Sequence, residues 1–81
     1  MKWQIKVKLK PGILDPQGKT VNHALHHLGF HQIKEVRIGK LMDIEMEDMP
    51  EAEARKILEE ASRKLLANPV VEEFEIEGPL P

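Results

Sequence analysis

One stretch decides the fold, Glu35-Val36-Arg37-Ile38-Gly39-Lys40-Leu41-Met42-Asp43-Ile44-Glu45-Met46-Glu47. Its apolar side chains occupy even positions in most of the stretch, and Lys40 interrupts that series. A two-residue hairpin turn at Gly39-Lys40 would place Asp43 and Glu45 on the buried face of a sheet, which is unfavourable. Two alternatives remain: an odd-length loop or bulge around Gly39, or one long bent strand that leaves its own subunit and pairs with another.

Alternating apolar and polar residues predict a strand on either side of this stretch. The first strand carries Trp3, Ile5, Val7 and Leu9 on one face and ends at Pro11-Gly12. The last strand begins at Val70, with Phe74 and Ile76 on the same face and Glu73, Glu75 and Glu77 on the other. Residues 78–81 are expected to form a loose tail.

Helical spacing of apolar residues predicts two helices. The first runs from about Pro16 to Leu28, with Asp15 as its N-cap, a stripe of Val21, Ala24, Leu25 and Leu28, and Gly29 as its stop. The second begins with an Asp48-x-x-Glu51 capping box, continues through apolar positions from Ala54 to Leu65, and ends at Asn68-Pro69. Asn68 is expected to take a left-handed C-cap conformation.

The predicted order is β-α-β-β-α-β, or β-α-β-α-β if the central stretch is one strand. This order predicts a single α+β domain over residues 1–81, a two-layer ferredoxin-like sandwich with both helices on one face of an antiparallel sheet. With 81 residues and no cysteine, hydrophobic burial only about balances the entropy of ordering the chain. We therefore expect oligomerisation, including a strand- or segment-exchanged dimer.

Composition excludes several functions. Twelve Lys and Arg against fourteen Asp and Glu give a net charge of −2, so no positive field attracts nucleic acid or a membrane surface. The absence of cysteine and of a long apolar run favours a cytoplasmic protein without disulfides or a membrane span. His23, His26 and His27 lie opposite the apolar stripe of the first helix, and we predict a solvated histidine surface there and no metal site.

Turn and cap residues account for much of the loop sequence, but not for all of it. The residues with an evident turning or capping role are Pro11, Gly12, Pro16, Gly18, Gly29, Gly39 and Pro69. Folding does not account for Gln17, Arg37 or Lys40. Lys40 falls on the side of the alternating pattern that faces the core. Its charge therefore needs a carboxylate or carbonyl partner, which could lie across a subunit boundary.

Four segments carry a resemblance to a known family. They are Leu9-Lys10-Pro11-Gly12-Ile13-Leu14-Asp15-Pro16-Gln17-Gly18, Ala24-Leu25 with Leu28-Gly29-Phe30, Val36-Arg37-Ile38-Gly39-Lys40, and Leu65-Leu66-Ala67-Asn68-Pro69-Val70-Val71-Glu72. On these segments the chain resembles the PurS family, the small subunit of phosphoribosylformylglycinamidine synthase in purine biosynthesis.

The resemblance implies an accessory subunit without an active site or cofactor of its own. In the full enzyme, a glutaminase subunit (PurQ) releases ammonia and a synthetase subunit (PurL) uses ATP and magnesium to convert formylglycinamide ribonucleotide to formylglycinamidine ribonucleotide. A PurS dimer, which can exchange segments and pair into a tetramer, joins the two. The residues that we assign to docking on these partners are Asp15, Gln17, Lys19, Arg37, Lys40 and Asn68.

Another class of function is open from the residues alone. A small-molecule-binding regulatory domain of ACT type also pairs β-α-β-β-α-β sheets across a dimer and holds effectors at the interface. A stand-alone enzyme is disfavoured, because the sequence offers no convergent nucleophile and base.

Overall fold

The structure is a computed structural model that describes all residues from Met1 to Pro81. The elements in chain order are β1 (Lys2–Leu9), α1 (Pro16–His27), β2 (Gly39–Glu45), α2 (Glu51–Ala61), a π-helical turn η1 (Ser62–Leu66) and β3 (Glu72–Leu80). The predicted α+β class is confirmed, with the order β-α-β-α-β. None of the helices combines the length and the apolar character needed to cross a lipid bilayer.

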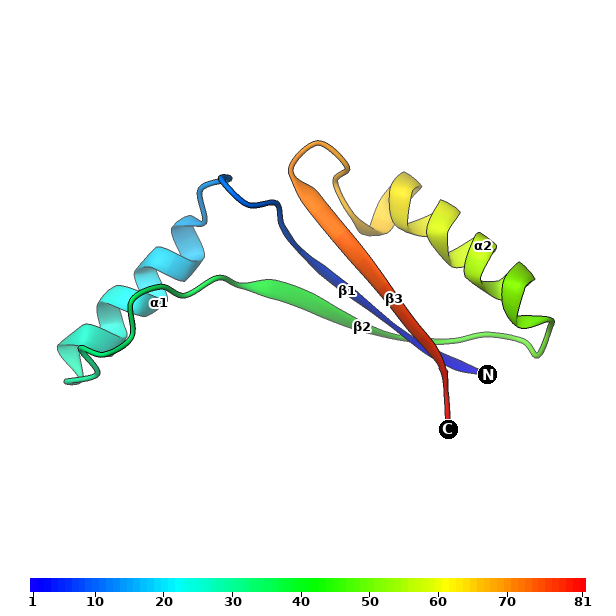
Figure 1. Cartoon of the computed structure of the whole chain (residues 1–81), viewed down its shortest axis with the longest axis horizontal. Coiled ribbons are helices and arrows are strands. Elements are labelled where there is room, and N and C mark those ends of the chain that lie inside the picture. The colour runs from blue at the N-terminus through cyan, green and yellow to red at the C-terminus, as the bar shows by residue number, and fades with distance from the viewer.

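The sheet has three antiparallel strands in the order β2-β1-β3 (Figure 1). Residues 39–45 form one continuous strand that pairs with β1 of the same chain, so the hairpin and the bulge at Gly39 are not formed. Gly39 is a strand residue and not a turn residue. A Cβ at this position would lie 2.5 Å from the carbonyl oxygen of Val7, so the missing side chain lets β2 approach β1 closely.

The core lies between the sheet and α2. Its six buried apolar residues are Trp3, Ile5, Val7, Ala54, Leu58 and Ala67. The alternation in β1 therefore predicted its buried face correctly. Arg55 of α2 lies 5.3 Å from the centre of the Trp3 ring on β1. It also donates hydrogen bonds to the carbonyl oxygens of Ile76 and Gly78 on β3, so it joins α2 to β1 and β3.

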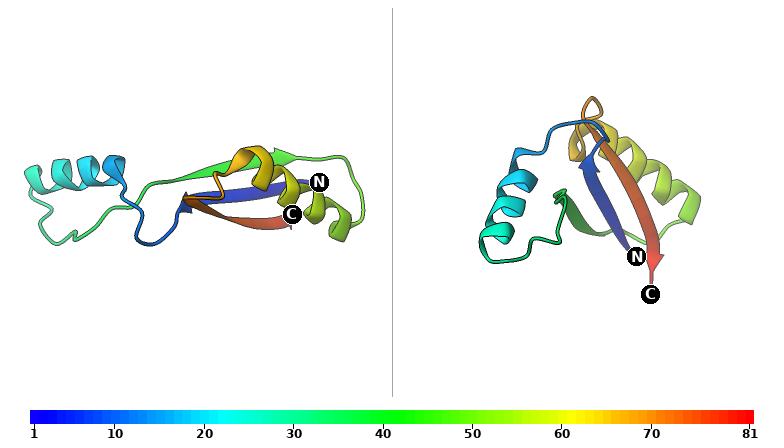
Figure 2. Two further views of the ribbon diagram at one scale, coloured as in Figure 1. Left: turned by 90° about the horizontal axis from the view of Figure 1, so that it is seen from above. Right: turned by 60° about the vertical axis from the view of Figure 1, so that its left-hand side comes forward.

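α1 does not lie on the sheet, contrary to the prediction that both helices cover one face. It extends beyond the end of the sheet, as Figures 1 and 2 show, and the molecule measures 49 × 29 × 14 Å. The predicted apolar stripe is present, but Val21 is 38% exposed and Leu28 is 73% exposed. The periodicity identified the helix correctly, but it could not identify the surface that covers the stripe.

Three local predictions at chain ends and caps were wrong. Asp48 does not cap α2, whose N-cap is Pro50, but accepts a hydrogen bond from the amino group of Met1. Asn68 is not left-handed; its side-chain oxygen accepts a hydrogen bond from the N–H of Val70 in a tight turn. Val70 is exposed in that turn and precedes β3.

The C-terminal tail is part of the sheet and is not loose. β3 continues to Leu80, which pairs with Lys2, and an irregularity in the register lies between Lys2 and Gln4. At Gly78 a Cβ would meet the Trp3 ring at 2.7 Å. The absence of a side chain there lets the strand pass directly over the indole.

The Asp15 carboxylate attaches α1 to the segment that leads into β2. Asp15 is buried, and it accepts hydrogen bonds from the N–H of Gly18 at 2.8 Å and from the N–H of Ile38 at 2.7 Å. The first of these bonds caps α1 as predicted, with Pro16 in the first turn. The second bond was not predicted, because it joins residues 23 positions apart.

Gly18 makes this attachment possible. It is buried in the first turn of α1, and a Cβ there would overlap the carbonyl oxygen of Val36 and the Asp15 carboxylate. The glycine therefore serves a close approach of two backbone segments. The two predicted turn glycines Gly12 and Gly29 do adopt positive φ angles, of 86° and 98°.

We expect Asp15→Asn to lower the free energy of unfolding at pH 7 and to have a smaller effect in acid. The N–H groups of Ile38 and Gly18, helped by the charge of Arg37, hold the pKa of Asp15 below its ordinary value of 3.8. A carboxylate with a lowered pKa stabilises the fold above that ordinary value, and the stabilisation is lost as the pH falls through the lower pKa of the folded state. Urea unfolding of both proteins between pH 2 and 7 measures the difference.

Glu47→Gln is the matched control, because Glu47 is exposed and makes no hydrogen bond or ion pair in the chain. Its unfolding free energy should follow that of the parent at every pH. If the difference in unfolding free energy between Asp15→Asn and the parent is constant from pH 7 to pH 2, the assigned role of the carboxylate is contradicted.

Candidate functional site

Three loop segments meet at one end of the sheet, where β1 ends and β2 and β3 begin. Antiparallel pairing places Lys8 opposite Gly39 and Leu9 opposite Glu72. The segments 10–15, 36–40 and 67–72 therefore converge, and we call this region the loop end. It brings together Asp15, Arg37, Lys40 and Asn68, four of the predicted docking residues.

Hydrogen bonds hold the three segments of the loop end together. Lys10 donates from its N–H to the carbonyl of Val71 at 2.9 Å and from Nζ to the carbonyl of Pro69 at 2.8 Å. The Arg37 guanidinium donates to the carbonyl of Ile13 at 2.7 Å and to that of Lys10 at 3.2 Å. Arg37 therefore positions backbone within its own chain, a role that its sequence position did not reveal.

Lys40 finds its carboxylate partner in its own chain. Lys40 Nζ lies 3.9 Å from Glu72 Oε2, while Glu72 Oε1 accepts a hydrogen bond of 2.7 Å from the N–H of Asn68. The expected partner across a subunit boundary is thus not needed. The Lys40 side chain is 61% exposed and the Glu72 side chain 18%, so this ion pair contributes little stability by itself.

Sequence reasoning missed Glu72, although a signal was available. Glu72 shares its parity with Phe74 and Ile76, just as Lys40 shares its parity with Met42 and Ile44. Lys40 and Glu72 therefore both fall on the core-facing side of their strands, and both strands flank β1. Opposite charges placed in this way are candidates for an ion pair beyond the end of the core.

Gln17 and Lys19 lie apart from this network, on the exposed first turns of α1. Neither side chain makes a hydrogen bond or an ion pair within the chain. Both are therefore available to a partner. Among the predicted docking residues they differ in this respect from Asp15 and Arg37, whose polar atoms are already bonded.

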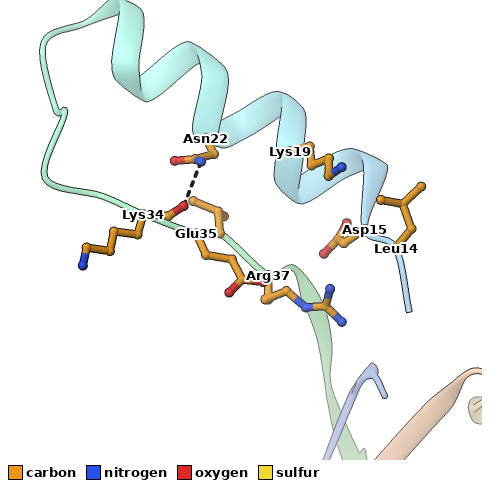
Figure 3. A pocket seen from close by; sticks show the side chains of 8 residues that line it. Leu14, Asp15, Lys19, Asn22, Lys34, Glu35 and Arg37 are labelled. Atoms are coloured by element: carbon orange, nitrogen blue, oxygen red, sulfur yellow. Dashed lines mark hydrogen bonds between the residues drawn. The ribbon is translucent and has the colours of Figure 1, made fainter. Parts of the chain in front are cut away.

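A shallow cavity of about 180 Å³ lies between α1 and the segment that leads into β2 (Figure 3). Asn22 closes one side, where its Nδ2 donates to the carbonyl of Lys34 at 3.3 Å. The lining mixes three cations with two carboxylates, an arrangement that suits contact with a polar protein surface more than capture of a small ion. The lining residues are Leu14, Asp15, Lys19, Asn22, Lys34, Glu35, Val36 and Arg37.

Large apolar side chains are exposed on three parts of the molecule. Around α1 these are Leu14, Val21, Leu28 and Phe30; on β2, Leu41; and on and after α2, Ile57, Leu65 and Val70. Only nine of the 81 residues are buried. Such extensive apolar exposure marks interaction surfaces.

Comparison with known proteins identifies the family. The family model described as PurS, phosphoribosylformylglycinamidine (FGAM) synthase, matches residues 2–79. The chain is 47% identical over 70 residues to phosphoribosylformylglycinamidine synthase subunit PurS of Methanocaldococcus jannaschii, a match that covers 86% of this chain and 84% of the relative. It is 40% identical to the Bacillus subtilis PurS subunit, with 94% of this chain and 89% of the relative covered.

Solved structures give the same result. The crystal structure of Methanocaldococcus jannaschii PurS superposes with a TM-score of 0.84 at 45% identity, over 94% of this chain and 92% of that one. A chain in the structure of PurLQS from Thermotoga maritima superposes with a TM-score of 0.85 at 34% identity, over 94% and 93%. The chain therefore belongs to the PurS family of phosphoribosylformylglycinamidine synthase subunits, which act in purine biosynthesis.

Proposed function

We propose that this chain is the non-catalytic bridging subunit of phosphoribosylformylglycinamidine synthase. As a dimer it joins the glutaminase subunit to the synthetase subunit and helps to enclose the transfer of ammonia between them. The observation that carries the proposal is the uncovered apolar stripe of α1 on a chain that superposes on one chain of a PurLQS structure.

Burial supports the dimer. α1 extends beyond the sheet without a surface of its own chain to cover Val21 and Leu28. A second copy has the same uncovered stripe, so a two-fold arrangement can cover both with one set of contacts. Further pairing of dimers would use the apolar side chains that remain exposed on α2 and β2.

The chemistry of ammonia supports a role in closure. In neutral water ammonia is mostly protonated, and ammonium is not a nucleophile. Transfer from a glutaminase site to a synthetase site therefore needs a path that excludes bulk water. A rigid subunit placed where the two larger subunits meet can complete such a path without supplying a reacting group.

The proposed docking surface has two parts. Gln17 and Lys19 contact a partner directly, because their side chains are unbonded and exposed. Asp15, Arg37, Lys40 and Asn68 keep the loop end in shape. Lys40 also presents an exposed ammonium group toward a partner. ATP and magnesium belong to the synthetase subunit in this proposal.

Reconstitution tests the bridging role. The synthetase and glutaminase of the same organism are assayed for product with either glutamine or ammonium chloride as nitrogen source, with and without this chain. We expect the chain to raise glutamine-dependent product formation by at least about tenfold, or about 1.4 kcal/mol in barrier terms, and to leave ammonia-dependent formation nearly unchanged. Glutamine-dependent formation that is equally fast without the chain would refute the proposal.

Charge reversal at Lys19 tests the docking surface. We expect Lys19→Glu to weaken assembly with the two larger subunits by about tenfold, because a repulsive charge at an interface costs on the order of 1 kcal/mol or more. Lys56→Glu, on α2, is the control, since it makes the same charge change at another exposed helical lysine without intramolecular bonds. Equal binding of the two variants in analytical ultracentrifugation would show that the docking surface lies elsewhere.

A double substitution tests the dimer. Val21→Asp with Leu28→Asp places two carboxylates in the apolar stripe, and we expect it to raise the dimer dissociation constant by about a hundredfold, because buried charges are strongly disfavoured. The matched control, Ile57→Asp with Leu65→Asp, should remain dimeric. Sedimentation velocity measures both, and circular dichroism checks that the helices are retained. A parent protein that stays monomeric at the highest concentration measured would also contradict the dimer.

A further inference from the structure

The histidine pair of α1 has no part in the proposed bridging function. His23 and His27 lie one helical turn apart and are both exposed. Their Nε2 atoms are 3.2 Å apart, and the ring centres are 4.7 Å apart. The two Nε2 atoms are within hydrogen-bond distance of each other, so both lie within reach of one ion placed beside them.

This separation fits two ligands of one metal ion. A zinc–imidazole bond is about 2.0–2.1 Å long, so two imidazole nitrogens on one tetrahedral ion are about 3.3–3.4 Å apart. The observed 3.2 Å is close to that value. The α-helix holds the two residues one turn apart, so binding an ion requires rotation of the two imidazole rings but no change of the backbone.

The other histidines near α1 are placed differently. His26 directs its Nε2 to the carbonyl oxygen of Ile33 at 2.6 Å. His31 stacks edge-on against His26, with ring centres 5.7 Å apart. The chain has no group of three or more His, Cys, Asp or Glu arranged around one metal position, so the site offers two protein ligands and leaves the remaining positions to water.

The sequence predicted a solvated histidine surface and no metal site here, but the 3.2 Å separation of the two Nε2 atoms points the other way. We propose that His23 and His27 chelate one divalent transition-metal ion of the class that prefers imidazole, namely Cu²⁺, Ni²⁺ or Zn²⁺. Hard cations such as Mg²⁺ require oxygen ligands, which this pair does not supply. On the helical wheel the pair lies opposite Val21, Leu25 and Leu28, so it stays accessible when the apolar stripe is covered. The site is independent of the bridging function.

Titration of the full, tag-free chain with NiCl₂ tests the site, with isothermal calorimetry as the readout. We expect one Ni²⁺ per chain, and we expect His23→Ala and His27→Ala each to weaken binding by about tenfold or more, because the second imidazole acts at a high effective concentration. Cu²⁺ should bind more tightly than Ni²⁺, and MgCl₂ should give no heat of binding.

Two control variants separate a defined pair from general histidine content. His31→Ala and His26→Gln each remove one imidazole outside the pair, and both should bind Ni²⁺ as the parent does. Ni²⁺ should also raise the melting temperature of the parent and of both controls, but not that of His23→Ala or His27→Ala. A parent that does not bind Ni²⁺, or a control that loses binding as much as His23→Ala does, would overturn the proposal.

Discussion

A single chain of this protein has more apolar surface than it can cover. One helix, α2, lies over the face of the sheet that carries Trp3, Ile5 and Val7, and these three residues form the core together with Ala54, Leu58 and Ala67. α1 has no such surface and extends beyond the sheet with its apolar stripe exposed. Because exposed apolar area is costly in water, this imbalance supports both the proposed dimer and the proposed place of the chain between larger subunits.

The polar residues of the loop end act mainly as framework. Asp15 ties the start of α1 to Ile38, Arg37 binds two carbonyl groups of the preceding loop, and Glu72 links Lys40 to the turn at Asn68. These bonds join segments distant in sequence. They explain why the Asp15-Pro16-Gln17-Gly18 and Ala67-Asn68-Pro69-Val70 segments, which carry the family resemblance, also determine the geometry that a partner would meet.

Local patterns predicted local structure well. Alternation in β1, the Asp15-Pro16 start of α1 and the glycine at its end have the predicted roles. The wrong predictions concern residues whose hydrogen-bond partners lie far away in the sequence. Asp48 binds the amino terminus and leaves α2 without a side-chain cap, and residues 78–80 extend β3 because Lys2 is available to pair with them. The docking role of the loops stays a prediction.

Period and spacing, read from the amino acids alone, determined which segments are helices and strands and which faces are apolar, because these properties depend on neighbouring residues. The family resemblance came from four short segments of the sequence itself. The tertiary structure decided that residues 39–45 form one strand beside β1, that α1 leaves the sheet, and that Arg37, Lys40 and Asp15 bond within the chain. These features depend on contacts between segments more than 20 residues apart in the sequence. A local sequence pattern does not show which of these distant segments come into contact.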